Sequence, residues 1–587
     1  MTNAILIFTF SPVQSFIAEA RRASDLFVGS QILVQLARAA GKAIQAQGGD
    51  LIYPVSEAPD KPDSDVPNKL VARVLWEKVQ TTADEAQKAL IREWENLANS
   101  ARTTLMCNWQ IKTDARWEAI WIRQTESLWE VYWAAAQMTD DDYARAYRHA
   151  SAAMDARKRS RVFAPADEEG VKDSLSGCRE ALHTQNMDAK AYWKSVKIGP
   201  PRLRPDGRER LDAIGAIKRS CRLADRRFCS TSTVAAEDFR ERAAPYLDDY
   251  RAAVEALLRG HLEPVREHPQ WPYDGDLLFL ETLTADRLAD SYGLKQPDRQ
   301  RLDTARAALR KVYDQIQTHP RPYYAIVALD GDNMGKHIDA CLAEGDPEAA
   351  HRRLSRQLSQ FAECVRQKVA PGFLVYAGGD DMLVLTPLSQ ALPLAQTLAT
   401  RFREITGGTA SAGIAIAHHL YPLDAALEAA RTAERQAKRV TNKAAVCVHV
   451  LKRSGERVEI RSRWDAMDTT FEEIASLFQE SDDSAGSSLA SRFAYEVLQA
   501  AYALPRPDDK FESELKRLLK RHRNTQHPHA LEPGVWAKRL RTWAEKLPEP
   551  PKDLPRKARA PMSFSTQTAE LGHWLVLAHF IVQGGVE

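Results

Sequence analysis

The sequence lacks any hydrophobic run long enough to cross a membrane and any close pair of cysteines. No stretch approaches the roughly 18 consecutive apolar residues of a membrane helix, and the chain enters an apolar strand at Ala4–Phe8 with no charged leader before it. We therefore expect no membrane span and no signal peptide. The seven cysteines are odd in number and none are spaced as Cys-x-x-Cys, which is typical of reduced thiols in a cytoplasmic protein.

An excess of charge of one sign is also missing. The 81 lysine and arginine residues nearly balance the 79 aspartate and glutamate residues, and the formal net charge is +2. This balance excludes a general electrostatic coat for nucleic acid, so any such binding must come from local patches. With 587 residues, of which 44% are hydrophobic, the chain is long enough for several globular domains.

Two acidic turns stand out, and each follows a strand-like apolar run. The first, Asp330-Gly331-Asp332, follows Tyr323–Leu329, and the second, Gly378-Gly379-Asp380-Asp381, follows Phe373–Tyr376. Carboxylates at the end of one strand and at the tip of a neighbouring hairpin can meet at the edge of a sheet and hold two divalent cations. We therefore predict that Asp330, Asp380 and Asp381 are catalytic and bind Mg²⁺ or Mn²⁺.

A purely structural explanation exists for each turn. Asp380 and Asp381 could be turn formers, and Asp330 could cap a helix. For either motif alone, the structural explanation and the metal site are equally good interpretations. Both motifs together, on adjacent strands, favour the metal site.

Several neighbours of these carboxylates are candidate nucleotide contacts. Gly331, Asp332, Asn333 and Met334 lead into a helix whose first N–H groups could meet a triphosphate. Gly378 and Gly379 would allow a tight hairpin and the close approach of a nucleotide. Ser411 at a strand start and Lys438 at a helix end could also face the nucleotide, although ordinary strand and helix-end chemistry explains them equally well.

The apolar periodicity predicts an α+β fold. Strands at 4–10, 50–54 and 69–75 alternate with helices at 13–47 and 78–107, and Gly29 is a candidate break in the first helix. Residues 110–150 have a helical pattern and are rich in tryptophan, which we assign to core and interface. Residues 322–451 repeat the order as β-α-β-β-α-β, which is typical of a palm or ferredoxin-like unit.

These patterns predict four domains: a first palm-like domain over 1–150, a basic and mainly helical insert over 151–320, a second palm over 321–455, and a C-terminal helical bundle over 456–587.

Several segments together resemble the large subunit of type III CRISPR effector complexes of the Cmr, or III-B, kind. These segments are Phe10–Ile17 with Ala20–Arg22 and Asp25–Leu26, Val66–Lys69, Ile217–Arg219, Leu329–Gly335, Gly378–Asp381 and Ser411–His419.

The resemblance implies two ferredoxin-like palm domains, a zinc-bearing insert and a helical C-terminal domain. It implies an antiviral nucleotidyltransferase that joins ATP into cyclic oligoadenylate at the Gly-Gly-Asp-Asp palm when target RNA binds. The implied partners are the other Cmr subunits, guide RNA, target RNA and ATP. Transfer of adenylate to another small molecule, a free-standing cyclase that makes a cyclic dinucleotide, and a nucleotide-binding scaffold without catalysis remain as alternatives.

The chain departs from the family pattern in two respects. No His-Asp dipeptide occurs, so we expect no nuclease of the HD type. Where the family has two Cys-x-x-Cys pairs, this chain has Asp173, Ser176, Asp212 and Gly215. Serine and glycine side chains are not zinc ligands, so we predict an insert without zinc that is held by packing alone.

Three basic stretches are candidate contacts for RNA or for partner subunits, although each alone is more often a solvated face. They are Arg202–Arg227, Lys516–Arg523 and Arg556–Arg559.

Overall fold

The computed structural model describes most of the chain. The described residues are 2–55, 66–160, 168–196, 203–204, 207–221, 228–265, 270–370, 372–453, 455, 457–467, 470–479, 487–525, 527, 531–548 and 566–584. They form two compact units, of which unit 1 comprises 1–320, 333–384 and 422–424, and unit 2 comprises 321–332, 385–421 and 425–587.

The N-terminal sheet belongs to unit 1 and has the strand order β2-β3-β1-β4. Its strands are β1 (Asn3–Ser11), β2 (Asp50–Tyr53), β3 (Lys69–Leu75) and β4 (Glu130–Gln137), and all neighbours are antiparallel. Helices α1 (Gln14–Ala18), α2 (Ala23–Ala46) and α3 (Val79–Cys107) complete a β-α-β-β-α-β sequence of elements. This is the ferredoxin-like order, and the sequence predicted all of it except β4.

The prediction that 110–150 is helical is wrong in its middle. The segment contains α4 (Ala115–Glu126), then β4, then the start of α5 (Tyr143–Arg159). β4 forms because its backbone completes the open edge of β1, with Ala134 opposite Ile7, so sheet pairing overrides a weak local pattern. The tryptophans are placed as expected: Trp109, Trp117, Trp121 and Trp129 are buried.

The first helical segment is also divided differently from the prediction. The break lies at 19–22 between α1 and α2, and Gly29 lies inside α2. The side chain of Asp25 accepts hydrogen bonds from the backbone N–H groups of Arg21 (3.4 Å) and Arg22 (3.2 Å), so it caps the start of α2.

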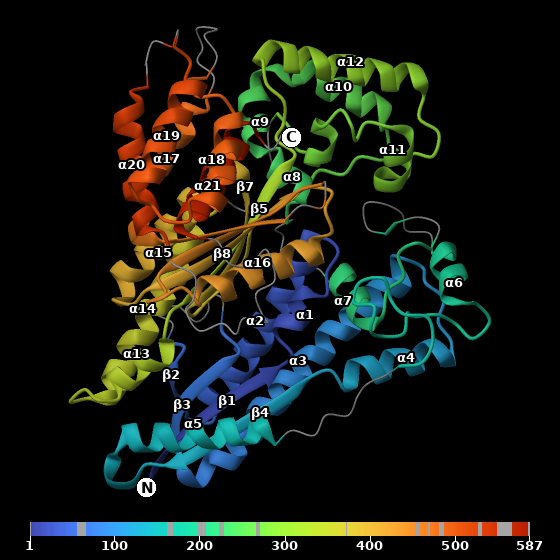
Figure 1. Cartoon of the computed structure of the whole chain (residues 1–587). Helices are drawn as coiled ribbons and strands as arrows, with labels where there is room; N and C mark the ends of the chain where they lie inside the picture. The colour runs from blue at the N-terminus through green and yellow to red at the C-terminus, as the bar shows by residue number, and fades with distance from the viewer. Residues whose placement is uncertain are drawn as a thin grey trace. The chain divides into compact units, whose positions relative to one another are not determined.

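Unit 1 continues with further helices of varied length. They are α6 (Ala189–Ser195), α7 (Ala213–Ser220), α8 (Thr231–Ala235), α9 (Glu237–Ala243), α10 (Asp248–Leu257), α11 (Ala285–Tyr292) and α12 (Arg299–Ile316). Figure 1 shows α10 and α12 lying side by side, and α9 joins them through the edge-to-face contact of Phe239 with Tyr313.

The second sheet has the strand order β10-β9-β8-β5-β7-β6. Its elements are β5 (Tyr323–Gly331), α13 (Met334–Cys341), α14 (Pro347–Lys368), β6 (Leu374–Gly378), β7 (Asp381–Pro387), α15 (Ala391–Thr406), β8 (Ala410–His418), α16 (Leu423–Ala437), β9 (Ala445–Leu451) and β10 (Arg457–Arg463). This element order confirms the predicted palm pattern up to β9. Every residue of β8 is buried, as expected for a central strand covered on both faces.

Strand β10 was not predicted and lies in the segment that the sequence assigned to the helical domain. It pairs antiparallel with β9, from Arg457 opposite Leu451 to Arg463 opposite Ala445. Its inward positions Val458, Ile460 and Ser462 alternate with outward arginines and a glutamate. The pattern is therefore strand-like, but it is short and strongly charged.

The C-terminal part of unit 2 is helical. It comprises α17 (Thr470–Leu477), α18 (Arg492–Ala503), α19 (Asp509–His522), α20 (Pro533–Lys546) and α21 (Gln567–Val582), which gather around α21 in Figure 1. Buried residues such as Leu571, Trp574 and Leu577 lie all around α21, because other helices and β10 surround it. Within the described residues, no helix combines the length and the apolar character that a membrane crossing requires. Most of the proline-rich linker predicted at 547–561 lies outside the described residues.

Candidate active site

The Gly-Gly-Asp-Asp segment forms the tip of a hairpin in unit 1. Gly378 pairs with Asp381, so Gly379 and Asp380 are the two loop residues between β6 and β7. Gly379 has a φ of +66°, as in the type II′ turn of a two-residue hairpin. A Cβ at Gly379 would also lie 2.6 Å from the Tyr53 hydroxyl oxygen. Only glycine therefore fits this position, which confirms the tight hairpin that the sequence predicts.

Two tyrosines surround the acidic pair. The Tyr376 hydroxyl donates a hydrogen bond of 2.7 Å to Oδ2 of Asp381, which fixes the orientation of that carboxylate. Burial, and next the nearby Asp380 carboxylate, raise the pKa of Tyr53 well above its ordinary value. Tyr53 is therefore a neutral phenol at physiological pH.

A cavity of about 470 Å³ lies beside this turn, and all of its lining residues belong to unit 1. Asp380, Asp381 and Tyr376 line it at the turn, and Met334 and Ile338 of α13 also line it. Most of its wall is apolar and comes from α1, α2, β3 and α14, through residues that include Ile17, Leu33, Val34, Val71, Leu354 and Leu358. Its size, and a mainly apolar wall with polar groups gathered at the acidic turn and beside His351, are those of a small-ligand site.

Hydrogen bonds join the N-terminal sheet and its helices to the elements that follow β5. The Ser30 hydroxyl of α2 donates to the carbonyl of Val375 in β6 at 2.7 Å. The Val55 N–H donates to the Ser355 hydroxyl at 2.7 Å, and the Ser359 hydroxyl donates to the Val55 carbonyl at 3.1 Å. These bonds hold α2 and the segment after β2 against β6 and α14, and Ser30 and Ser355 themselves line the cavity.

A second polar group in the cavity wall consists of Lys69, Tyr147 and His351, with Tyr143 behind His351. The Tyr143 hydroxyl lies 2.7 Å from Nδ1 of His351, and Nζ of Lys69 lies 3.4 Å from the Tyr147 hydroxyl. Burial, and then the charges of Lys69 and Arg352, lower the pKa of His351 to about 4. His351 is therefore neutral at pH 7, and Lys69 is the cation of this wall.

Asp330 lies at the end of β5 in unit 2, where it has a cationic partner. Nζ of Lys438 lies 2.6 Å from Oδ2 of Asp330 and 3.3 Å from Oε1 of Glu434. Burial raises the pKa of Asp330, and the ammonium group of Lys438 offsets this only in part. The structure thus brings together two predicted site residues, Asp330 and Lys438, within unit 2.

Asp332 and Ser411 also bond to each other within unit 2. The Ser411 hydroxyl donates to the Asp332 carboxylate at 2.9 Å and 3.1 Å, and the Thr409 hydroxyl and the Ala444 N–H donate to it at 2.9 Å and 3.0 Å. Both side chains are buried. This arrangement ties the ends of β5, β8 and β9 together, and it presents neither side chain to solvent.

The turn after β5 has the predicted helix start. Gly331 is the last residue of β5, and Asn333 precedes α13 with φ 55° and ψ 35°, a left-handed conformation that asparagine tolerates. A Cβ at Gly335 would meet nothing within 4 Å. The Asn333 side chain makes no capping hydrogen bond, and the Lys336 N–H donates to the Asn333 carbonyl at 2.8 Å, so Met334, which lines the cavity, begins a helix without a side-chain cap.

The carboxylates of the acidic turn are donors of the kind that a divalent cation prefers. Asp380 and Asp381 are half-buried carboxylates on the cavity, and Mg²⁺ binds through one or two such groups together with substrate phosphates. Within the described residues, no group of three or more His, Cys, Asp or Glu side chains is arranged to hold a metal. The acidic pair therefore fits a cation that arrives with a nucleotide, and not a closed protein cage.

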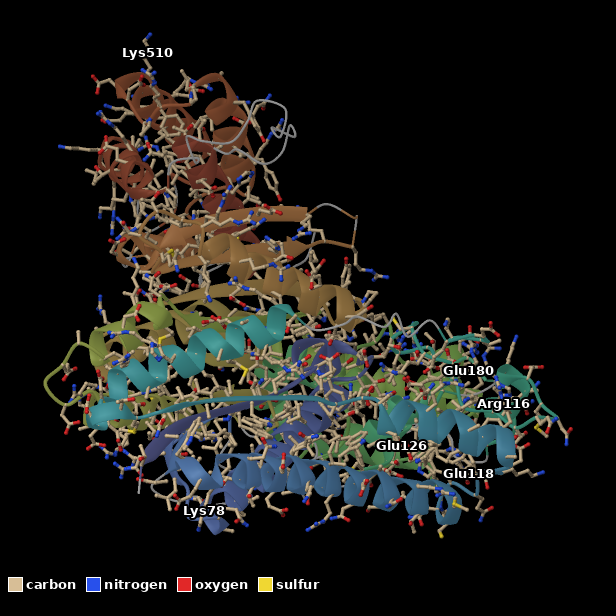
Figure 2. The ribbon with its side chains drawn as sticks, turned by 90° about the horizontal axis from the view of Figure 1, so that it is seen from below. Lys78, Arg116, Glu118, Glu126, Glu180 and Lys510 are labelled. Carbon is tan, nitrogen blue, oxygen red and sulfur yellow. The ribbon has the colours of Figure 1, made fainter. Side chains whose placement is uncertain are left out.

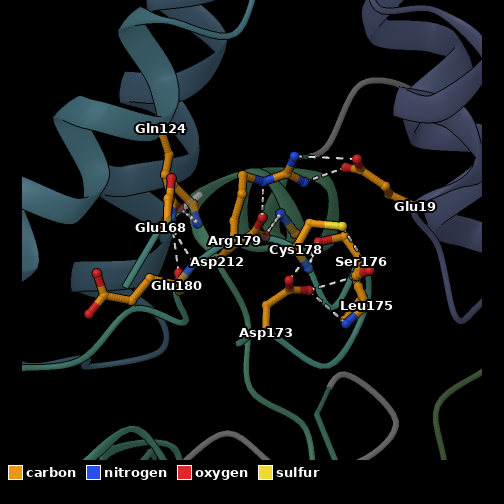
Figure 3. Close-up of polar contacts among 12 residues, drawn as sticks. Glu19, Gln124, Glu168, Asp173, Leu175, Ser176, Cys178, Arg179, Glu180 and Asp212 are labelled. Carbon is orange, nitrogen blue, oxygen red and sulfur yellow. Dashed lines mark hydrogen bonds and ion pairs between the residues drawn. The ribbon is translucent and has the colours of Figure 1, made fainter. Parts of the chain in front are cut away.

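At the positions where the resemblance predicts zinc ligands, Asp173 and Asp212 accept hydrogen bonds from the backbone instead (Figure 3). Oδ1 of Asp173 accepts from the N–H groups of Leu175 and Ser176 at 2.7 Å each, and Oδ1 of Asp212 accepts from the Gly215 N–H at 2.6 Å. Ser174 pairs with the backbone of Arg210, which joins the two loops. These acceptors are in use and the remaining groups are not zinc ligands, so this donor set does not fit a zinc ion.

Arg179 is the cation at this position. Its guanidinium bonds both Asp212 and Glu19, as Figure 3 shows. Burial disfavours the charged guanidinium, but Asp212 and Glu19 more than offset this and raise its pKa. The prediction that packing alone holds the insert is therefore wrong, because a buried ionic network holds it.

Helix α7 adds two further buried cations that the sequence analysis placed in a basic stretch. Nζ of Lys218 donates to the carbonyls of Phe16 and Glu19, and Arg219 forms two hydrogen bonds of 2.7 Å with Asp25. Burial lowers the pKa of Lys218 to about 8. These contacts join helix α7 of the insert to the corner between α1 and α2.

The other basic residues are distributed differently. The structure describes only part of the stretch 202–227 and none of 556–559. Most of the stretch Lys516–Arg523 lies on α19, where Arg517 forms an ion pair of 2.7 Å with Glu514.

Two segments of the chain match family models. Residues 323–447 match the second palm domain of Cas10/Cmr2, and residues 5–99 match the N-terminal part of CRISPR-associated protein Cmr2. The CRISPR system Cmr subunit Cmr2 of Pyrococcus furiosus is 30% identical over 265 residues, an alignment that covers 40% of this chain and 30% of that protein. The sequence match thus spans less than a third of that relative.

Two solved structures share the fold over the whole chain. A cryo-EM structure of type III-B Cmr-beta in the apo state has a TM-score of 0.60 at 13% identity and covers 100% of this chain and 82% of that chain. The Cmr-beta structure bound to cognate target RNA has a TM-score of 0.63 at 12% identity, with coverage of 100% and 83%.

Proposed function

Because these matches support its identification as a Cmr2-type large subunit of type III-B CRISPR systems, we propose that this chain is a nucleotidyltransferase that target RNA activates. It converts ATP into a cyclic oligoadenylate within a complex of Cmr subunits and guide RNA. The observation that carries the proposal is the mainly apolar cavity of about 470 Å³ that ends at Asp380 and Asp381. The four-domain division and a cytoplasmic location stay predictions from the sequence.

The cavity walls suit a nucleoside. Apolar side chains from α1, α2, β3 and α14 exclude water from a bound base. Gly379 lets a ligand approach the hairpin backbone closely, since no side chain stands between them. Lys69 is a cation that can meet phosphate oxygen at a distance from the acidic turn.

The acidic turn is the proposed reaction centre. Asp380 and Asp381 would hold Mg²⁺ or Mn²⁺, which when bound neutralises phosphate charge and lowers the pKa of an attacking hydroxyl. Tyr376 keeps the Asp381 carboxylate oriented toward the cavity through its 2.7 Å hydrogen bond. The positive end of the α13 dipole, which has no side-chain cap, favours a phosphate beside Met334.

The remaining predicted residues support this site less directly. That Asp330 is a third metal ligand stays a prediction from the sequence. Within unit 2, the Lys438 ammonium forms an ion pair with its carboxylate. We assign Asp332 and Ser411 to holding strand ends, because their polar atoms bond to one another.

The test is to incubate the assembled complex with labelled ATP, Mg²⁺ or Mn²⁺ and matching target RNA, and to identify products by mass spectrometry. Asp380→Asn/Asp381→Asn is the variant, and Asp339→Asn, an exposed aspartate on α13, is the matched control. Oligoadenylate that depends on RNA and is lost only in the double variant supports the proposal. A mixed adenylate formed only with added metabolites indicates transfer to another small molecule, and no product under either condition indicates a scaffold subunit.

A further inference from the structure

Lys438 lies between two carboxylates of unit 2. Its Nζ is 2.6 Å from Oδ2 of Asp330 and 3.3 Å from Oε1 of Glu434. The side chains of Lys438 and Asp330 are 25% and 28% exposed, and the side chain of Glu434 is 9% exposed. Charges at this degree of burial are screened by water and salt less than charges on an open surface. The ammonium group is therefore an effective local counter-ion for both carboxylates.

The fold fixes the position of this ammonium group. Lys438 directly follows α16, and its backbone N–H donates to the Glu434 carbonyl at 3.0 Å, so the two side chains share one face of a helical turn. Gly413 of β8 lies against the same turn, since a Cβ there would be 2.7 Å from the Cα of Glu434. Two residues earlier in β8, Ser411 pairs with Asp330 of β5. The missing side chain at Gly413 thus lets α16 come close enough to place Lys438 at the end of β5.

The two carboxylates differ in their other partners. Among the described side chains, Lys438 is the one that forms an ion pair with Asp330. Glu434 also lies 3.3 Å from Nη1 of Arg431, and it precedes Lys438 by four residues, which is a favourable spacing for an ion pair on a helix. When another cation takes the oxygen of Asp330, Lys438 keeps Glu434. The ammonium group can therefore release Asp330 without losing its only anionic partner.

We infer that Lys438 is a built-in counter-ion that competes with a divalent cation for Asp330, and that it thereby sets the cation concentration at which the site loads. The inference rests on the proposed function, because it takes Asp330 as a metal ligand. An ammonium group and a divalent cation repel each other, so they do not share one carboxylate oxygen. Before loading, Lys438 keeps a half-buried carboxylate paired, which avoids the cost of an uncompensated charge. A contact of Lys438 with nucleotide phosphate alone would leave cation binding unchanged when nucleotide is absent.

The experiment measures the binding of Mn²⁺ to the full chain without nucleotide or RNA. Electron paramagnetic resonance follows the free Mn²⁺ while manganese chloride is added at neutral pH. The test variant is Lys438→Gln. The matched control is Arg435→Gln, which removes one positive charge from an exposed position of α16 where Arg435 bonds to Glu428 at 2.6 Å. Both substitutions are also made together with Asp330→Asn, which completes a double-mutant cycle.

We expect Lys438→Gln to bind Mn²⁺ roughly tenfold more tightly, because the competing charge is gone. Lys438→Arg, which keeps the charge, should bind Mn²⁺ like the unmodified protein, and so should Arg435→Gln. Unchanged or weaker binding by Lys438→Gln would overturn the inference, and an equal gain in Arg435→Gln would do the same by showing a general electrostatic effect. A gain that persists beside Asp330→Asn would show that Lys438 acts through another group, which also overturns it.

A second measurement separates the counter-ion role from a phosphate contact. ATP in EDTA is titrated into the same proteins by calorimetry, and circular-dichroism melting curves verify that each variant is folded. Weaker ATP binding by Lys438→Gln together with unchanged Mn²⁺ binding would assign Lys438 to phosphate and overturn the inference. The Mn²⁺ cycle requires no catalysis. A complex that makes no oligoadenylate but shows the expected cycle therefore contradicts the proposed function alone, whereas oligoadenylate synthesis without the cycle contradicts this inference alone.

Discussion

The Tyr53 hydroxyl oxygen lies only 2.6 Å from the place that a Cβ at position 379 would take. Tyr53 ends β2 of the N-terminal sheet, and Gly379 begins the loop between β6 and β7. A residue from the first sheet thus limits which side chain the acidic turn can accept.

Gly379→Ala should therefore lower the melting temperature and reduce ATP conversion. The left-handed φ disfavours alanine by about 1–2 kcal/mol, and the contact with Tyr53 adds to this. Tyr53→Phe removes the oxygen, so the double variant Tyr53→Phe/Gly379→Ala should recover the part of the loss that is due to the contact. A double variant no better than Gly379→Ala would contradict the contact, and Gly335→Ala, where nothing lies within 4 Å, is the matched control.

Asp332→Ala should destabilise unit 2 although the residue lies beside the predicted catalytic carboxylate. The substitution removes the acceptor for Ser411, Thr409 and Ala444, and each buried donor left unsatisfied costs about 1–3 kcal/mol. The midpoint of urea denaturation should fall clearly. Asp380→Ala, a half-buried residue at the turn, should leave this midpoint nearly unchanged while it abolishes activity; a reversed order of the two midpoints would refute the structural role of Asp332.

Arg179→Met should loosen the insert. Asp212 is almost fully buried, and removing its cationic partner leaves a buried carboxylate at a cost of about 3–5 kcal/mol. Arg179→Met/Asp212→Leu should recover only part of this loss, because the unpaired Asp212 carboxylate is then removed but the Gly215 N–H at the start of α7 loses its acceptor. The control is Arg116→Met: Arg116 lies close to Glu180 in Figure 2, but Glu180 keeps Arg123 as a second partner. Thermal unfolding measures all three, and similar losses for Arg179→Met and Arg116→Met would disprove the central place of Arg179.

His351 should make unit 1 sensitive to acid. Its pKa is about 4 in the folded protein, against an ordinary value of 6.5, so both folded and unfolded states hold it neutral above pH 6.5. Below pH 6.5 the unfolded chain takes up the proton first, and stability falls by up to about 3 kcal/mol by pH 4. His351→Gln should flatten the pH dependence of the melting temperature over this range, whereas the exposed His149→Gln should not. Parallel curves for His351→Gln and the unmodified protein would contradict the pKa shift.

The elements of the palm that follow β5 could be located from sequence because their patterns are local. β5 and β8 are long, apolar and buried, and the two glycines before Asp380 predict a hairpin by their backbone freedom alone. The strands β4 and β10 escaped prediction because their stability comes from pairing with β1 and β9, which no local window contains.

The acidic turn, the helix after β5 and the family resemblance could be recognised in the sequence, since each depends on neighbouring residues. The cavity depends on folding, because α14 lies far along the chain from the α2 and β3 that share its wall. The same holds for the bond between Asp332 and Ser411 and for the bonds of Arg179 to Asp212 and Glu19. The reason is physical, because the groups that surround a charged side chain come from distant parts of the chain that folding brings together. A window of neighbouring residues does not show them.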